Sequence, residues 1–433
     1  MSETLFALQL AHLKRLDRAY TDILERLGFE SVAIYSGHSD YFFADDHAPA
    51  FQAYGHFMHW VGLSDAEHSW VVIEPGQKPR LLLYAPSDFW HLTTTLPDEP
   101  WIEAFDITLC QKPTAPTLSK NAAVIGDTAR LGEEQRQTLG SVELTPESLI
   151  TALDELRVTK TDYELACLRE ANRLAKAGHQ AAKASFIGVG AELDIQLAYL
   201  GASRQRESRV PYQNIIGLNG HAGVLHYQHY DLTPPKMRHS LLVDAGHRFR
   251  GYCADITRTH VGPDAPEIFA ALVVALHGLK NELVQCIGPG VEFTALHETM
   301  HQRLADILVS FDLYKDSAES ALELGVTRAF CPHGLGHLLG LQVHDVAGLK
   351  TEDGAPLPAP EKHPALRLTR TLKPGMVVTI EPGLYFIPML LSPLKEQGRA
   401  VNWPLVESLI NCGGIRIEDN VLVTESGFEN LTP

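Results

Sequence analysis

Five acidic or imidazole side chains in the second half of the sequence lie inside short apolar segments that read as strands. They are Asp244 in LLVDAG, Asp255 in ADITRTH, His337 in PHGLGHLLGLQVHD, Glu381 in TIEPG and Glu418 in IRIED. An unpaired charge in such a run is costly. Four carboxylates gathered in one buried place repel one another and stay protonated unless cations neutralise them. Two divalent ions balance four carboxylates, so the sequence predicts a dinuclear metal centre.

The two aspartates flank a segment that is typical of a β-hairpin. Asp244 precedes and Asp255 follows GHRFRGY, whose glycines predict a turn between two paired strands. Paired strands can present both carboxylates to one point. An isolated aspartate beside a glycine more often caps a turn. We expect Asp255 to stand in a strand, which favours the metal site over the cap.

Three histidines fall within twelve residues of a glycine-rich segment. The spacing of His333 and His337 does not indicate a helical zinc motif, because no glutamate follows His333 and glycines are poor helix formers. A lone histidine in an apolar run is usually a packed core residue. Three of them, with His344 the last, favour a functional site.

The two glutamates are expected at strand positions. Glu381 follows a strand and precedes a Pro-Gly turn, so its side chain is expected at a strand end. Arg416 and Glu418 alternate with isoleucines and are expected on one strand face. The alternative for this second pair is a simple salt-bridged strand edge.

The order Asp, Asp, His, Glu, Glu in these contexts resembles the pita-bread metallopeptidase family. The similarity runs from Thr161 to the C-terminus and is most specific in PHGLGHLLGLQVHDVAG and LKPGMVVTIEPGLYF. Within the family, the chain is most similar to bacterial members that hydrolyse X-Pro dipeptides. Some of these are also organophosphorus acid anhydrolases, which act on phosphotriester-like compounds.

The resemblance implies a role for each metal-binding residue. It implies that Asp244 chelates one ion, that Asp255 and Glu418 bridge two ions, and that His337 ligates one. Glu381 is implied to be both a ligand and the catalytic proton carrier. The oxygen-rich ligand set suits two Mn²⁺ ions per subunit, with Co²⁺ able to substitute, and such ions lower the pKa of water.

The resemblance also implies substrate contacts. Among the catalytic residues it places His226, which stabilises the developing oxyanion, and Arg416, which hydrogen-bonds the ligating carboxylates. The implied substrate-binding residues are His333, His344, Arg367, Tyr212 and Asp45. Arg367 matches an arginine that binds the C-terminal carboxylate of the substrate. Its alternative is a solvated arginine in a basic loop with Arg370 and Lys373.

Three functions follow from these patterns. The favoured one is a homodimeric, metal-dependent dipeptidase acting on X-Pro dipeptides that carry a free proline carboxylate, with accessory organophosphorus hydrolysis. The first alternative is an aminopeptidase P-like enzyme acting on longer X-Pro peptides, against which Arg367 argues. The second is a metal-free pita-bread binding module, which retention of all five ligands disfavours.

Composition narrows the class of protein. The chain has 433 residues, 45% of them hydrophobic, and a net charge of −17. The length predicts two domains, and the charge argues against nucleic acid or an anionic membrane as partner. Six scattered cysteines without a paired motif, and an amphipathic rather than apolar start, predict a cytoplasmic protein.

The pattern of elements predicts the domain organisation. Alternating helix and strand signals predict a mixed α/β domain over residues 1–155, with a hairpin around the Pro-Gly of HSWVVIEPGQKPRLLLYAP. A linker is placed at 156–160. Thr161 and Glu164 then form a capping box that opens the catalytic domain, residues 161–433. This domain is expected to be α+β, with helices on one face of an antiparallel sheet.

Overall fold

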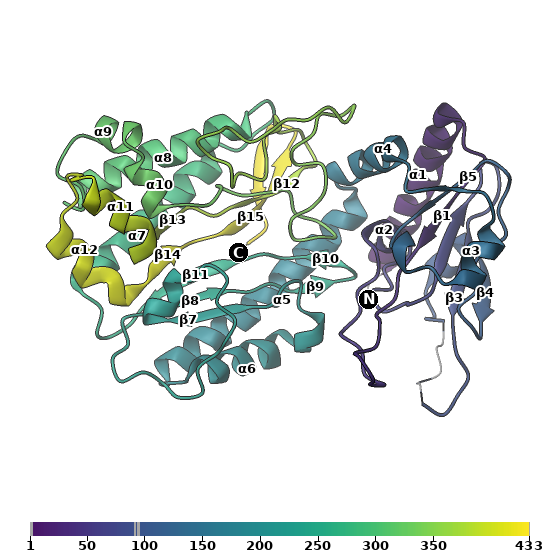
Figure 1. Cartoon of the computed structure of the whole chain (residues 1–433), viewed down its shortest axis with the longest axis horizontal. Helices are drawn as coiled ribbons and strands as arrows, with labels where there is room; N and C mark the ends of the chain where they lie inside the picture. Colours follow the sequence, from purple (N-terminus) through teal and green to yellow (C-terminus); the bar gives the residue numbers. More distant parts are fainter. Residues whose placement is uncertain (1–2, 91, 93–95, 433) are drawn as a thin grey trace. The chain divides into compact units, whose positions relative to one another are not determined.

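The structure is a computed structural model that describes residues 3–90, 92 and 96–432 (Figure 1). Its contacts divide the chain into two compact units. Unit 1 comprises Met1–Cys167, Arg250–Tyr252 and Glu352–Ala355, and unit 2 comprises Leu168–Phe249, Cys253–Thr351 and Pro356–Pro433.

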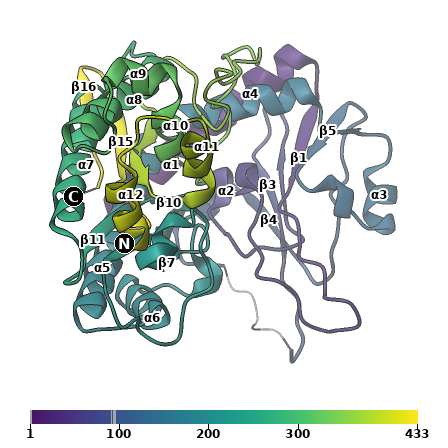
Figure 2. The same cartoon turned by 60° about the vertical axis from the view of Figure 1, so that its left-hand side comes forward.

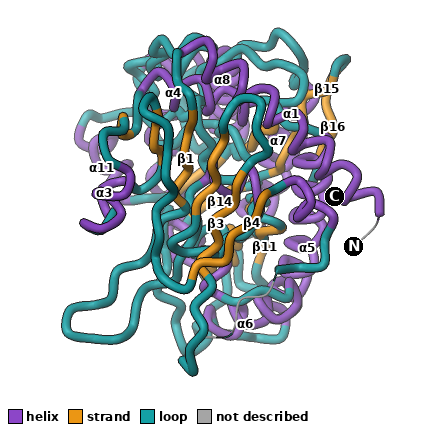
Figure 3. Tube along the Cα trace, turned by 90° about the vertical axis from the view of Figure 1, so that its right-hand side faces the viewer, coloured by secondary structure: helices purple, strands orange, loops and turns teal. Residues whose placement is uncertain are grey.

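Unit 1 is built around one mixed sheet of six strands in the order β4-β3-β2-β1-β5-β6. Its strands β1, β3 and β4 are labelled in Figure 3. Trp70 in β2 and Val124 in β5 are among the buried residues of its core. The strands are β1 (Ser31–Tyr35), β2 (Trp70–Ile73), β3 (Arg80–Tyr84), β4 (Asp106–Cys110), β5 (Ala122–Ile125) and β6 (Glu143–Leu144). The helices are α1 (Glu3–Leu27), α2 (Gly55–Val61), α3 (Glu133–Leu139) and α4 (Glu147–Val158).

One half of unit 2 packs two helices against an antiparallel sheet. The sheet has the order β11-β8-β7. Phe186 and Tyr199, one from each helix, are buried against Leu218 and Val243 of the strands. The elements are α5 (Asp162–Ile187), α6 (Glu192–Ser203), β7 (Ile215–Leu218), β8 (Ser240–Asp244) and β11 (Thr257–Val261), with β9 (Arg248–Phe249) and β10 (Tyr252–Cys253) between the last two.

The other half of unit 2 has its own antiparallel pairs and a second set of helices (Figure 2). Its sheets have the orders β12-β15-β16 and β13-β14. The strands are β12 (Val377–Ile380), β13 (Gly383–Tyr385), β14 (Gly414–Arg416), β15 (Asp419–Thr424) and β16 (Gly427–Asn430). The helices are α7 (Glu267–Gln285), α8 (Phe293–Ser310), α9 (Ala318–Glu323), α10 (Val326–Phe330), α11 (Pro388–Glu396) and α12 (Trp403–Leu409).

The predicted fold class is confirmed, and so are several local elements. The capping box forms, because the Thr161 amide donates to Glu164 Oε2 at 2.8 Å and the Glu164 amide donates to Thr161 Oγ1 at 3.4 Å. The β2–β3 hairpin pairs as expected. Among the described residues, no helix is long and apolar enough to cross a membrane.

Two strand assignments were wrong. Asp255 precedes β11 and lies outside any strand, and Glu418 lies between the end of β14 and the start of β15. The strands break where these carboxylates turn toward a common point, so regular pairing gives way to side-chain contacts: Thr257 Oγ1 donates to Glu418 and the Asp255 amide donates to Asn420 Oδ1.

Candidate metal centre and active site

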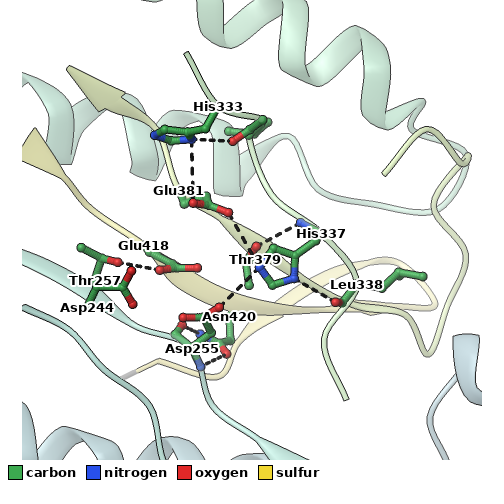
Figure 4. A network of polar contacts seen from close by, with 12 residues as sticks. Asp244, Asp255, Thr257, His333, His337, Leu338, Thr379, Glu381, Glu418 and Asn420 are labelled. Atoms are coloured by element: carbon green, nitrogen blue, oxygen red, sulfur yellow. Dashed lines mark hydrogen bonds and ion pairs between the residues drawn. The ribbon is translucent and has the colours of Figure 1, made fainter. Parts of the chain in front are cut away.

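Five chain segments of unit 2 converge on one buried group of side chains (Figure 4). Asp244 ends β8, and Thr257, its partner in the register, begins β11. Glu381 directly follows β12. All five predicted ligands are therefore brought together: Asp244, Asp255, His337, Glu381 and Glu418.

His337 is oriented for coordination. Its Nδ1 lies 2.9 Å from the carbonyl oxygen of Leu338, to which it donates a hydrogen bond when the imidazole is neutral. This fixes the tautomer and leaves Nε2 with a free lone pair. Nε2 lies 3.4 Å from Asp255 Oδ2 and 3.8 Å from Glu381 Oε1. Ligand atoms of Asp255, His337 and Glu418 all lie within 4.8 Å of one another.

Three of the four carboxylates, Asp244, Asp255 and Glu418, also have a hydrogen-bond partner that orients them. Arg416 Nη2 donates to Asp244 Oδ2 at 2.6 Å, and its Nε donates to Thr257 Oγ1 at 3.2 Å. Thr257 in turn donates to Glu418 Oε2 at 2.7 Å. The Tyr212 hydroxyl lies against carboxylate oxygens of both Asp244 and Asp255. The carboxylates are thus held in place by neutral donors and one arginine.

The electrostatics show a surplus of negative charge. Burial, together with repulsion from Asp255, raises the pKa of Glu381 to about 7. Burial and the same repulsion raise the pKa of Glu418 well above its usual range. Burial raises the pKa of Asp255 too, but its contact with His337 more than offsets this and lowers it overall. The single positive charge of Arg416 cannot compensate four carboxylates.

This donor set fits divalent cations. Four carboxylates and one imidazole Nε2 converge without a thiolate, which is the ligand chemistry of harder ions such as Mn²⁺. Divalent ions held by these residues would supply the positive charge that the cluster lacks.

His333 lies beside this group. Its Nε2 is 2.8 Å from the Tyr385 hydroxyl, which also accepts from Arg416 Nη1 at 2.8 Å. Its Nδ1 is 3.9 Å from Glu381 Oε2. Burial and the charge of Arg416 lower its pKa to about 4. His333 is therefore a neutral hydrogen-bonding group at neutral pH.

The remaining predicted catalytic and substrate-binding residues are not all in one neighbourhood. His226, His344 and Arg367 are exposed. The His344 ring centroid lies 4.3 Å from that of His337. Burial, then the positive charges of His337, Arg367 and His226, lower the pKa of His344 to about 4, so these residues share one neighbourhood. Asp45 lies in an exposed loop of unit 1, and its role stays a prediction.

One residue that positions this site was missed by sequence analysis. Glu192 is fully buried at the start of α6 and accepts hydrogen bonds from the amides of Leu218 at 2.8 Å and Asp231 at 2.7 Å. It also contacts Tyr227 Oη at 2.6 Å and His221 Nδ1 at 2.8 Å. Because His221, Tyr227 and Asp231 lie on both sides of His226, these contacts hold the segment that carries it in place. An acidic residue in a first helical turn is common, so the sequence offers no signal for this role.

Matches to models of known sequence families show which family the chain belongs to. The profile described as Metallopeptidase family M24 matches residues 166–425. The chain belongs to metallopeptidase family M24. The profile described as Xaa-Pro dipeptidase, N-terminal domain, matches residues 7–154. The predicted family resemblance is confirmed.

Two relatives of nearly equal length have the same name, Xaa-Pro dipeptidase. The Xaa-Pro dipeptidase of Marinobacter nauticus is 48% identical over 436 residues, covering 100% of this chain and 99% of its own. The Xaa-Pro dipeptidase of Shewanella amazonensis is 44% identical over 437 residues, covering 99% and 98%.

Solved structures show the same fold in more distant proteins. Aminopeptidase P of Escherichia coli superposes with a TM-score of 0.73 at 20% identity, covering 100% of this chain and 95% of its own. Proline aminopeptidase P II of Yersinia pestis gives a TM-score of 0.71 at 21% identity, covering 96% of each. At this identity the similarity speaks for the fold alone.

Proposed function

We propose that the protein is an X-Pro dipeptidase with two Mn²⁺ ions in the carboxylate centre. The buried convergence of Asp244, Asp255, His337, Glu381 and Glu418 carries the proposal. Full-length relatives named Xaa-Pro dipeptidase support the choice of substrate. Asp255 and Glu418 are proposed to contact both ions.

The chemistry divides between the ions and the side chains. The ions, when bound, act as Lewis acids and lower the pKa of water. Glu381 accepts the proton of the attacking water and delivers it to the proline nitrogen as the peptide bond breaks. His226 donates a hydrogen bond to the oxygen on which negative charge develops.

The substrate is held by the surrounding side chains. Arg367 pairs with the proline carboxylate. His344, whose pKa is influenced by both Arg367 and His226, faces the substrate. His333, held by Tyr385, lines the pocket. Tyr212 orients Asp244 and Asp255 through its hydroxyl. Asp45 is assigned to the amino end of the substrate.

Further parts of the proposal are the domain boundary at 156–160, a cytoplasmic homodimer, and organophosphorus hydrolysis as an accessory activity of the same site. Aminopeptidase P-like activity on longer X-Pro peptides is the second candidate, because it would use the same five ligands.

The deciding experiment compares substrates and metals. Gly-Pro, Leu-Pro and an X-Pro-Y tripeptide are each assayed after chelation and again after Mn²⁺ is added. We expect no turnover after chelation, recovery with Mn²⁺, and cleavage of the dipeptides far faster than the tripeptide. Preferred cleavage of the tripeptide would establish the aminopeptidase instead. Turnover that survives complete removal of metal would refute the metal centre.

A further inference from the structure

A second group of potential metal ligands lies in unit 2 and contains no carboxylate. His297 and His301 stand one turn apart on α8, and His363 comes from a later loop. One nitrogen of each imidazole lies within 4.8 Å of the others. The ring centroids are 4.4 to 4.7 Å apart. Three imidazoles thus face one point from two distant segments.

The sequence of this helix carries a pattern that sequence analysis overlooked. Residues 297–301 read HETMH, an H-E-x-x-H arrangement. In a helix this spacing puts both histidines on one face, as zinc sites require, but the pattern is common by chance and needs its structural context. Here the segment is helical, and His363 supplies a third nitrogen. His297 and His301 therefore lie on a helix, which is the structural context that His333 and His337 lack.

The imidazoles are buried with unused nitrogens. His297 and His301 are 1% and 3% exposed, and His297 Nε2 and His301 Nδ1 have no hydrogen-bond partner within the described part of the chain. A buried polar atom without a partner costs about 1–3 kcal/mol. Coordination to an ion would give each of these two nitrogens a partner. Burial lowers the pKa of His297 to about 2 and of His301 to about 3, so protons do not compete for these nitrogens at neutral pH.

A cavity beside two of the three imidazoles offers space for a fourth ligand. His297 and His363 line a cavity of about 160 Å³ together with Arg328 and Lys362. The two cationic side chains weaken the attraction of a metal ion, and they favour a small anion as its fourth ligand. An all-nitrogen set selects borderline ions such as Zn²⁺ over Mn²⁺.

From this geometry we propose that His297, His301 and His363 form a separate mononuclear site for Zn²⁺ or a similar transition-metal ion. Nitrogens that share a tetrahedral ion at about 2.0–2.1 Å lie about 3.4 Å apart, so the imidazoles move inwards when the ion binds. The Leu335 amide now donates to His297 Nδ1 at 3.2 Å. Coordination through Nε2 places a proton on Nδ1, so that long bond opens as the ion enters.

The test counts ions on the full-length protein. Protein saturated with Mn²⁺ is titrated with Zn²⁺, desalted, and analysed for both metals. We expect three ions per chain in the parent and two in His301→Ala and His363→Ala. The matched control is His277→Ala, a half-buried histidine on α7, which should keep all three. Loss of a ligand should weaken Zn²⁺ binding by more than the ~10–100-fold that loss of an outer partner costs.

Two further measurements distinguish loss of the histidine site from misfolding and from changes at the carboxylate centre. His301 is buried, so thermal unfolding checks that its variant folds; the half-buried His363 decides the result if it does not. Asp255→Asn protein separates this site from the carboxylate centre, because it should still bind Zn²⁺ at the histidines. A parent that takes up no ion beyond the carboxylate centre, or histidine variants that keep the third ion, would overturn the proposal.

Discussion

The carboxylate centre and the three-histidine cluster both lie in unit 2. They differ in whether their buried polar atoms have partners. In the carboxylate centre the charged groups have partners of their own: Arg416 on Asp244 and Thr257 on Glu418. In the histidine cluster, His297 Nε2 and His301 Nδ1 have no partner within the described residues. A carboxylate must be compensated before it can be buried as an anion, whereas an imidazole can be buried neutral.

The two groups also share a stretch of chain. Cys331 and His333 line the cavity beside the histidines, while His333 reaches Glu381 at 3.9 Å. Leu335 donates its amide to His297, and its carbonyl accepts from the Glu381 amide at 2.8 Å. Hard and softer ions would therefore bind on two sides of one segment, sorted by ligand type.

The largest effect is expected from Asp255→Asn, which would separate the two sites. Asp255 is proposed to contact both ions, so its loss should remove both and reduce turnover by more than the ~100-fold seen when an outer partner is lost. The measurement is metal content together with kcat on an X-Pro dipeptide. Asp255→Asn protein that retained two Mn²⁺ ions and near-normal turnover would contradict the assignment.

His226→Ala tests the donor that acts on the reacting oxygen without touching either group of ligands. Removal of one such donor typically lowers kcat by about 10²–10³-fold. Metal content should stay unchanged, since His226 is exposed and is not one of the five predicted metal ligands. If KM alone rises while kcat is kept, His226 is a binding contact and its proposed role is wrong.

The sequence predicted which five side chains come together better than it predicted their surroundings, because each of the five stands in a distinctive local motif. TIEPG and PHGLGH name Glu381 and His337 through neighbours in sequence. The partners that orient the ligands come from distant segments: Tyr212 reaches Asp255 across 43 positions, and Arg416 reaches Asp244 across 172. The family resemblance implied the contact of Arg416, whereas nothing in the sequence indicated that the Tyr212 hydroxyl lies against Asp244 and Asp255.

Two residues show how burial changes an interpretation made from sequence. Arg367 and Arg370 were weighed together as a basic loop, yet Arg370 is 4% exposed while Arg367 is exposed. Apolar neighbours, Leu366 and Leu368, alternate with Arg367 and are buried, which turns Arg367 outward. Sequence alone did not distinguish the buried Arg370 from the solvent-exposed Arg367.

Arg367→Ala tests substrate recognition. Loss of the partner of a partly desolvated carboxylate costs roughly 2–5 kcal/mol. Because Arg367 is exposed, we expect the lower end, about 2 kcal/mol, or about 30-fold in kcat/KM. An X-Pro amide, which lacks the carboxylate, should be cleaved poorly by the parent and lose little more in the variant. Equal losses on the dipeptide and its amide would mean that Arg367 supports structure.

Glu192→Gln should have the smallest effect, because Glu192 is proposed to act only through the segment that carries His226. Glutamine replaces one carboxylate oxygen by an amide donor, so it cannot accept all the hydrogen bonds that Glu192 accepts from Leu218, Asp231 and Tyr227. We expect kcat to fall by about tenfold, or ~1.4 kcal/mol, with KM nearly unchanged.

A double-variant cycle separates positioning from general support of the fold. If Glu192 acts by holding His226, Glu192→Gln lowers kcat in the parent but hardly at all in His226→Ala protein, because the group it positions is already gone. The two losses are then far from additive, as expected for residues in one network. Additive losses, together with a lower unfolding temperature in both backgrounds, would make Glu192 a structural residue of α6 and leave the placement of His226 to other contacts.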